Sequence, residues 1–116
     1  MIERLSFVCP TDDLVASVRR WSALLEAEPT FVDGDRWAQF DLGPVRLALA
    51  GSDRASDAAG LMVKVDDLEA ARAAARAGGF AVGAAESGPH EVRCTVGDPA
   101  GPEAVLYAAP PPDGAP

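Results

Sequence analysis

The chain has 116 residues, of which 48% are hydrophobic and 24% are charged, a length and balance typical of one compact globular domain. Its 18 acidic and 10 basic residues give a formal net charge of −8, and such a surface repels nucleic-acid phosphates, so we expect no nucleic acid partner. No apolar run approaches the ~20 residues of a membrane span, and no apolar secretory segment follows the first residues. We therefore expect no membrane partner and a cytoplasmic location.

Two cysteines and one histidine limit the chemistry of the chain. Cys9 and Cys94 lie far apart in apolar, strand-like segments, which predicts two buried free thiols rather than a disulfide. A single histidine excludes any site that needs a histidine pair. That histidine, His90, follows the turn-like Ser87-Gly88-Pro89, so we expect it to be solvated in a loop.

The first half of the chain predicts a strand, a helix and three further strands. The first strand covers residues 2–9 and is closed by Pro10. The helix ends at Pro29, and its N-terminus is capped by one of Thr11, Asp12 and Asp13. Its apolar stripe, with Trp21 in the predicted helix–sheet core, is Leu14, Val18, Trp21 and Leu25. Turn signals then separate strands expected at 30–32, 37–42 and 45–50.

The same order of elements begins again after residues 51–58, GSDRASDA, which are small and polar and predict a linker. A strand is expected at 61–65, and Asp66 with Glu69 forms a capping box for the next helix. Gly78-Gly79 ends that helix at its C-cap. Three more strands are expected at 80–84, 91–96 and 103–108.

Two sequence echoes mark an internal repeat. Asp12-Asp13-Leu14 recurs as Asp66-Asp67-Leu68, each time between the first strand and the helix of its half. Gly43-Pro44 recurs as Gly101-Pro102, each time before the last strand. Their recurrence in equivalent places indicates that the chain contains the same unit twice.

The repeat sets the predicted organisation of the chain. We predict an α+β fold made of two βαβββ modules, residues 1–51 and 59–109, which together form a single domain of residues 1–109. Residues 110–116 lack a packing pattern, which predicts a flexible tail.

The turn Gly97-Asp98-Pro99-Ala100-Gly101 before the last strand adds a family resemblance. With the repeat and the two Asp-Asp-Leu segments, it resembles the glyoxalase/bleomycin resistance protein/extradiol dioxygenase (vicinal oxygen chelate) superfamily, whose signature here is Asp-Pro-Asp-Gly and differs at Ala100. The resemblance implies two modules whose mixed sheets curl around a shared cavity, with the helices outside. It also implies a homodimer with two equivalent cavities, which the open sheet edges of such short modules favour as well.

The resemblance further implies four metal-ligand positions, where enzymes of the family carry His or Glu. In this chain they fall on Ser6, Ala48 or Leu47, Gly60 and Val105. Serine is a poor substitute, the other side chains offer no donor atom, and Glu103 on the last strand lacks partners. Because zinc, iron and manganese sites need several converging N or O donors, we expect no metal and no other cofactor.

Strand alternation predicts which side chains face the cavity. If Leu5, Phe7 and Cys9 face the helices, the residues between them face the cavity, and the same parity applies to the other strands. The ligand-binding residues predicted in this way are Ser6, Trp37, Gln39, Met62, Lys64, Arg93, Glu103, Val105 and Tyr107. This combination of rings and polar groups suits a small organic ligand that is planar or amphipathic.

Other interpretations of these side chains stay open. Trp37 is also explained as a half-buried cross-strand packing residue. Arg93, Lys64 and Glu103 are also explained as ion pairs with one another on a solvated sheet face. Asp98 is better explained as a turn former than as an acid or base, and no residue is predicted to be catalytic.

Two function classes follow. The first is a metal-independent small-molecule-binding protein, similar to the drug-binding members of the superfamily, which sequester an antibiotic. The alternative is a metal-independent or degenerate enzyme of the superfamily that acts on a small metabolite. A ligand-responsive regulatory subunit is a third, weaker candidate.

Overall fold

A computed structural model describes residues 2–110 of the chain, so the predicted tail lies outside the described residues except for Pro110. The helices are α1 (Leu14–Leu25) and α2 (Leu68–Ala77). The strands are β1 (Ile2–Pro10), β2 (Phe31–Asp33), β3 (Trp37–Leu42), β4 (Val45–Ala50), β5 (Gly60–Val65), β6 (Ala81–Val82), β7 (Glu86–Ser87), β8 (Val92–Gly97) and β9 (Glu103–Ala108). No helix within residues 2–110 is long and apolar enough to cross a membrane.

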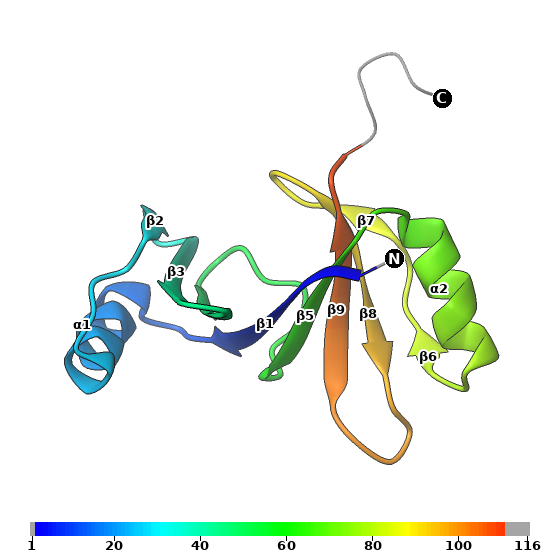
Figure 1. Ribbon diagram of the computed structural model, residues 1–116, viewed down its shortest axis with the longest axis horizontal. Coiled ribbons are helices and arrows are strands. Elements are labelled where there is room, and N and C mark those ends of the chain that lie inside the picture. The colour runs from blue at the N-terminus through cyan, green and yellow to red at the C-terminus, as the bar shows by residue number, and fades with distance from the viewer. Residues whose placement is uncertain (1, 111–116) are drawn as a thin grey trace.

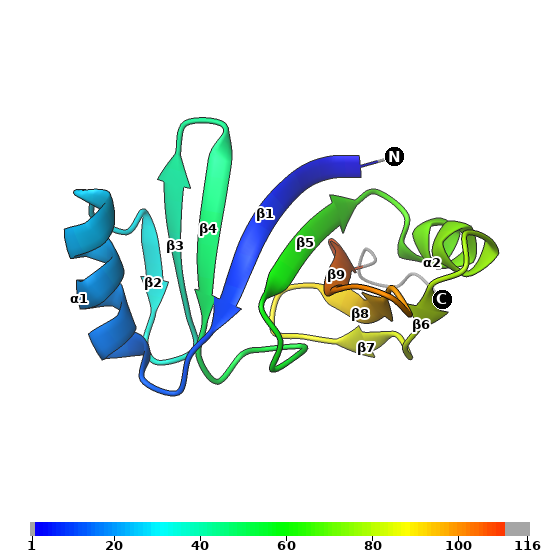
Figure 2. The ribbon, with the colours of Figure 1, turned by 90° about the horizontal axis from the view of Figure 1, so that it is seen from below.

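The nine strands of residues 2–110 belong to one curled, mixed sheet, which does not close into a barrel (Figures 1 and 2). Its order is β2-β3-β4-β1-β5-β9-β8-β6, with β7 paired to β8. The two halves of this order mirror each other, because β1 pairs with β4 in parallel in one module and β5 pairs with β9 in parallel in the other. The antiparallel β1–β5 pair joins the modules. The predicted fold class, two βαβββ modules with a curled mixed sheet and outside helices, is confirmed.

Both helices begin at the second aspartate of the repeated Asp-Asp-Leu. Asp13 accepts a hydrogen bond from Ala16 N (3.1 Å), and Asp67 accepts one from Ala70 N (3.0 Å). The predicted capping box at Asp66 is therefore wrong by one residue. An N-cap side chain accepts a hydrogen bond from the backbone N–H three residues later, and Asp67 is the residue that does so here. The two modules use their equivalent aspartates in the same way.

The first helix is shorter than the sequence predicts. It ends at Leu25, well before Pro29, because Glu26 adopts a left-handed conformation (φ 52°) and its N–H bonds to Ser22 O. The second helix ends at Gly78 as predicted, and Gly79 follows with φ 99°, a conformation that glycine adopts without strain.

The strands after α2 also differ from the prediction of a single strand at 80–84. The N–H of Phe80 bonds to Ala75 O (3.0 Å) and so closes the helix instead of opening a strand. Two short strands, β6 and β7, take its place, and both pair with β8, which begins one residue later than predicted. The last strand has its predicted bounds.

Each module has its own apolar core between a helix and the outer face of the sheet. Under α1, Phe40 is fully buried and Trp21 packs against the cluster that contains it, as predicted for Trp21. Under α2, the core centres on Val65, Cys94 and Leu106. Both cysteines are free, and Cys94 is buried as predicted, whereas Cys9 is only half-buried.

The middle of the outer sheet face is covered by neither helix, because α1 and α2 lie at opposite ends of the sheet (Figure 1). Cys9 packs beside α1 as expected, but Leu5 and Phe7 on β1 are each 54% exposed, and Leu61 on β5 is 39% exposed. An apolar groove of about 700 Å³ runs from this strip to the alanines of α2. Contiguous exposed apolar surface of this kind is typical of interaction sites, so we expect one on this strip.

The outer strip gives the predicted homodimer a surface. Phe7 pairs with Leu61 and Leu5 with Val63 across the antiparallel β1–β5 pair, so these side chains form one continuous apolar strip, and we expect a second copy of the chain to cover it. We expect a dimer at micromolar concentration in sedimentation, and we expect Phe7→Lys to sediment as the 12.0 kDa chain. Leu24→Lys, on the exposed outside of α1, is the matched control and keeps the dimer. A 12.0 kDa species for the unmodified chain contradicts this assembly.

Candidate functional site

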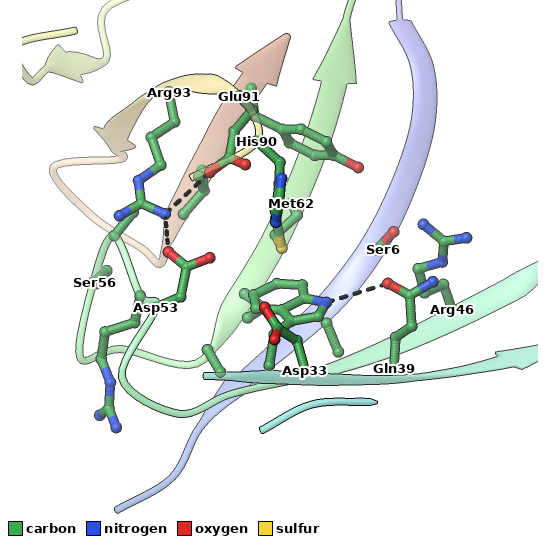
Figure 3. A pocket seen from close by; sticks show the side chains of 18 of the residues that line it. Ser6, Asp33, Gln39, Arg46, Asp53, Ser56, Met62, His90, Glu91 and Arg93 are labelled. Carbon is green, nitrogen blue, oxygen red and sulfur yellow. Dashed lines mark hydrogen bonds and ion pairs between the residues drawn. The ribbon is translucent and has the colours of Figure 1, made fainter. Parts of the chain in front are cut away.

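The concave face of the sheet encloses a cavity of about 220 Å³. Its walls come from β1, β2, β3, β4, β5, β8 and β9, from the linker between the modules, and from the turn before β8 (Figure 3). Both modules contribute, so the cavity exists only because the two halves pair in one sheet. A concave, mostly apolar space with a few polar groups is the usual form of a small-molecule site.

The strand register places Ser6 at the centre of the cavity floor. Ser6 on β1 pairs with Met62 on β5, and Met62 pairs with Val105 on β9. Side chains of paired residues point to the same face, so these three form one row across the sheet. All three line the cavity.

An aromatic wall is built on β3. Trp37 is half-buried and packs against a cluster of small side chains, Val8, Ala48 and Ala50, which leave room for its ring. Its indole N–H donates to the side-chain oxygen of Gln39 (3.2 Å), which holds the ring in place. The indole therefore forms an aromatic side of the cavity, against which we expect a planar molecule to stack.

An ionic cluster closes the opposite side. Arg93 on β8 makes ion pairs with Asp53 of the linker (2.7 Å) and with Glu91 (3.1 Å). Glu86 on β7 lies further away, at 3.9 Å from Nε. The Asp53 contact fastens the linker to the second module, so the linker forms a cavity wall rather than a free loop.

A corner rich in hydrogen-bond donors lies beside Ser6 (Figure 3). Arg46 on β4 is held by Asp41 through Nε (2.5 Å), and this guanidinium keeps the pKa of the Asp41 carboxyl low. Burial raises the pKa of the Tyr107 phenol, against the opposite effects of Arg4, Arg46 and Ser6. The Ser6 hydroxyl therefore lies close to the phenol, but it makes no hydrogen bond of normal geometry within the described chain.

The structure brings seven of the nine predicted ligand-binding residues to the cavity. These are Ser6, Trp37, Gln39, Met62, Arg93, Val105 and Tyr107. Lys64 and Glu103 do not line it. Lys64 lies near Glu3 (3.9 Å), and Glu103, the first residue of β9, accepts a hydrogen bond from Ser56 (3.0 Å). That the seven bind a ligand stays a prediction.

The predicted mutual pairing of Arg93, Lys64 and Glu103 is wrong, since each has a different partner. The physical reason is the arrangement of the strands: Lys64 pairs with Tyr107, which lies between it and Arg93, and Glu103 lies at the opposite end of β9. Asp98 forms the predicted turn, accepting hydrogen bonds from Ala100 N (2.9 Å) and Gly101 N (3.0 Å).

The sequence did not indicate several of the residues that line the cavity. Strand alternation could have predicted Arg46, because it lies on the same face of β4 as Ala48 and Ala50. Asp53 was not, because the linker has no periodicity. His90 lies in an exposed turn as expected, but that turn borders the cavity.

The cavity does not fit a metal ion. Ser6, Ala48 and Val105 line it at the family's ligand positions, and the β5 residue opposite Ser6 is Met62 rather than Gly60. None of these is a His, Cys, Asp or Glu. Across residues 2–110, no three such side chains gather in a way that could hold a metal.

No family model and no curated protein matches the sequence. Solved structures match the fold. A glyoxalase/bleomycin resistance protein/dioxygenase superfamily member from Vibrio splendidus 12B01 has a TM-score of 0.67 at 17% identity, covering 93% of this chain and 99% of its own. This chain has the fold of that superfamily. The resemblance expected from the repeat and the Asp-Pro turn is thus confirmed at the level of the fold.

Two further similar structures carry enzyme names. One is an NAD-dependent benzaldehyde dehydrogenase from Legionella pneumophila, with a TM-score of 0.76 at 14% identity, covering 91% of this chain and 99% of its own. The other is methylmalonyl-CoA epimerase from Mycobacterium tuberculosis, with a TM-score of 0.57 at 16% identity, covering 95% of this chain and 88% of its own. At such identities the likeness concerns the fold alone.

The phenol of Tyr107 gives the cavity a measurable signature. It is the only tyrosine, so absorbance at 295 nm follows it alone. Since burial raises its pKa, we expect a titration midpoint above the ordinary value of about 10, returning to about 10 in guanidinium. The folded chain then binds the phenolic proton more tightly than the unfolded chain, so this contribution to stability is present below pH ~10 and is lost as pH rises through the folded value. Equal midpoints in both states contradict the buried position.

Proposed function

We propose that this chain is a cytoplasmic, metal-independent small-molecule-binding protein whose ligand is planar and amphipathic. The observation that carries the proposal is the cavity between the modules, with Trp37 fixed as a flat wall and a few polar groups around it. Binding needs only such a concave surface, and the residues at the family's ligand positions offer no set of metal donors.

The size of the cavity limits the ligand. Pockets for drug-sized molecules span about 300–1,000 Å³, and this one has about 220 Å³. It suits a molecule of one or two rings, or one such part of a larger molecule. We further propose that binding sequesters a small aromatic antibiotic, by analogy with the bleomycin resistance proteins after which the superfamily is named.

The alternative function is a metal-independent enzyme, which we consider because two of the similar solved structures carry enzyme names. Nucleophilic catalysis needs a nucleophile activated by a base within hydrogen-bond reach. The Ser6 hydroxyl has no hydrogen-bond partner in the described chain, so no base activates it. This observation favours binding over catalysis.

The two tryptophans separate binding from stability. We expect 4-nitrobenzamide to quench the fluorescence of Trp37, and Trp37→Ala to weaken binding severalfold, since ring stacking is worth ~0.5–1.5 kcal/mol beyond area burial. Trp21→Ala should bind normally but lose stability, because removing a core aromatic costs ~3–5 kcal/mol, less where it is only half-buried. Calorimetry and denaturant unfolding of both variants measure this. Unchanged affinity in Trp37→Ala contradicts the placement of the ligand.

Metal independence is tested on protein purified without a metal-affinity tag. We expect elemental analysis to find no stoichiometric zinc, iron or manganese, and we expect 4-nitrobenzamide binding to survive dialysis against EDTA. The physical reason is the absence of converging N and O donors at the ligand positions of the cavity. One tightly held metal per chain, or loss of binding in EDTA, overturns the proposal.

A further inference from the structure

The polar groups around the cavity differ in whether they have partners within the described part of the chain: the carboxylates do, and some of the donors do not. Every carboxylate that lines it already has a guanidinium partner. Asp33 pairs with Arg36 (2.6 Å), and Asp53 and Glu91 pair with Arg93. The cavity therefore has little free acceptor capacity for a cationic ligand.

Hydrogen-bond donors on the other side of the cavity lack a partner among the residues that the structure describes. Ser6 is 3% exposed, and its hydroxyl lies in the cavity without a hydrogen-bond partner within residues 2–110. A buried hydroxyl left unpaired costs stability, so a site that keeps one is suited to a ligand that satisfies it.

Arg46 stands beside that hydroxyl. Asp41 engages its Nε, and the second oxygen of Asp41 accepts from Thr30 (2.9 Å), so the carboxylate anchors the guanidinium from behind. The two terminal amino groups of Arg46 have no partner among the described residues and remain as donors at the cavity wall (Figure 3). The fork of an arginine matches a carboxylate better than any other side chain does.

We propose that the ligand is a small planar carboxylate, with its ring on Trp37 and its carboxylate against Ser6, Arg46 and the Tyr107 hydroxyl. This inference rests on the proposed function and names the chemical class that the cavity takes. The net charge of −8 opposes an anion at long range, but exposed charges are screened beyond about 8 Å, so the local donors decide binding.

The test compares three molecules of one shape by calorimetry: 2-naphthoate, 2-naphthamide and 2-naphthylmethylammonium. Hydrogen bonds to a charged group predict that the carboxylate binds about ten- to a hundredfold more tightly than the amide. Equal affinity for acid and amide overturns the inference and leaves the proposed function standing. Tighter binding of the ammonium also overturns the inference. Binding of none of the three removes the proposed function itself.

Single substitutions identify which residues cause the preference for the carboxylate. Arg46→Gln should abolish the preference for 2-naphthoate over 2-naphthamide, Arg46→Lys should restore only part of it, and Ser6→Ala should reduce it severalfold. Arg19→Gln is the matched control, because it removes the same charge from the exposed side of α1 and should leave the preference intact. Loss of the preference in Arg19→Gln attributes it to net charge and overturns the inference.

Tyr107 supplies an independent readout. A carboxylate placed against the phenol disfavours the ionised form, so 2-naphthoate should raise the Tyr107 titration midpoint further, whereas 2-naphthamide should raise it less. An unchanged midpoint with saturating 2-naphthoate contradicts the proposed position of the carboxylate.

Discussion

The antiparallel pairing of β1 with β5 is the constraint on which the cavity depends. It sets Ser6 opposite Met62 and, through β9, brings Val105 into the same row. It also turns two open sheets into one continuous curled sheet, whose concave side draws side chains from both modules. A one-residue slip of this register would reverse every side chain of β1 and send Ser6 to the outer face.

The linker between the modules forms a part of the cavity wall that the sheet does not supply. Arg54 donates to two backbone carbonyls, Gly51 O and Thr11 O, and Asp53 pairs with Arg93 on the far module. These contacts hold a segment without regular structure against the mouth of the cavity. The side chains of Arg54 and Arg93 are both largely shielded from solvent, and ion pairs in such positions are screened less than exposed ones. The ligand volume is therefore limited by charge contacts as well as by the sheet.

Periodicity predicted the fold because the same order of elements occurs twice, and the alternation of β1 and β3 gave the correct cavity-facing side chains, although Leu5 and Phe7 on the other face of β1 are exposed instead of covered by a helix. It predicted Trp37 and Tyr107 in the cavity for the same reason. It failed for Lys64 and Glu103, since alternation gives the face of a strand but not which positions on that face border the cavity. Asp53 lay beyond this reasoning, because only the folded sheet brings the linker to Arg93.

The chemistry of this fold resides in a few positions of the concave face rather than in the sheet itself. In this chain those positions hold a hydroxyl, a thioether and apolar side chains, which suit the proposed binding through stacking and hydrogen bonds. The carboxylates at the rim are neutralised by arginines, whereas Ser6 and the terminal amino groups of Arg46 are not matched by acceptors. An acidic protein thus carries a cavity in which donors without an acceptor favour a negatively charged group. In the proposed binding, the local balance of donors and acceptors outweighs the net charge in selecting the ligand.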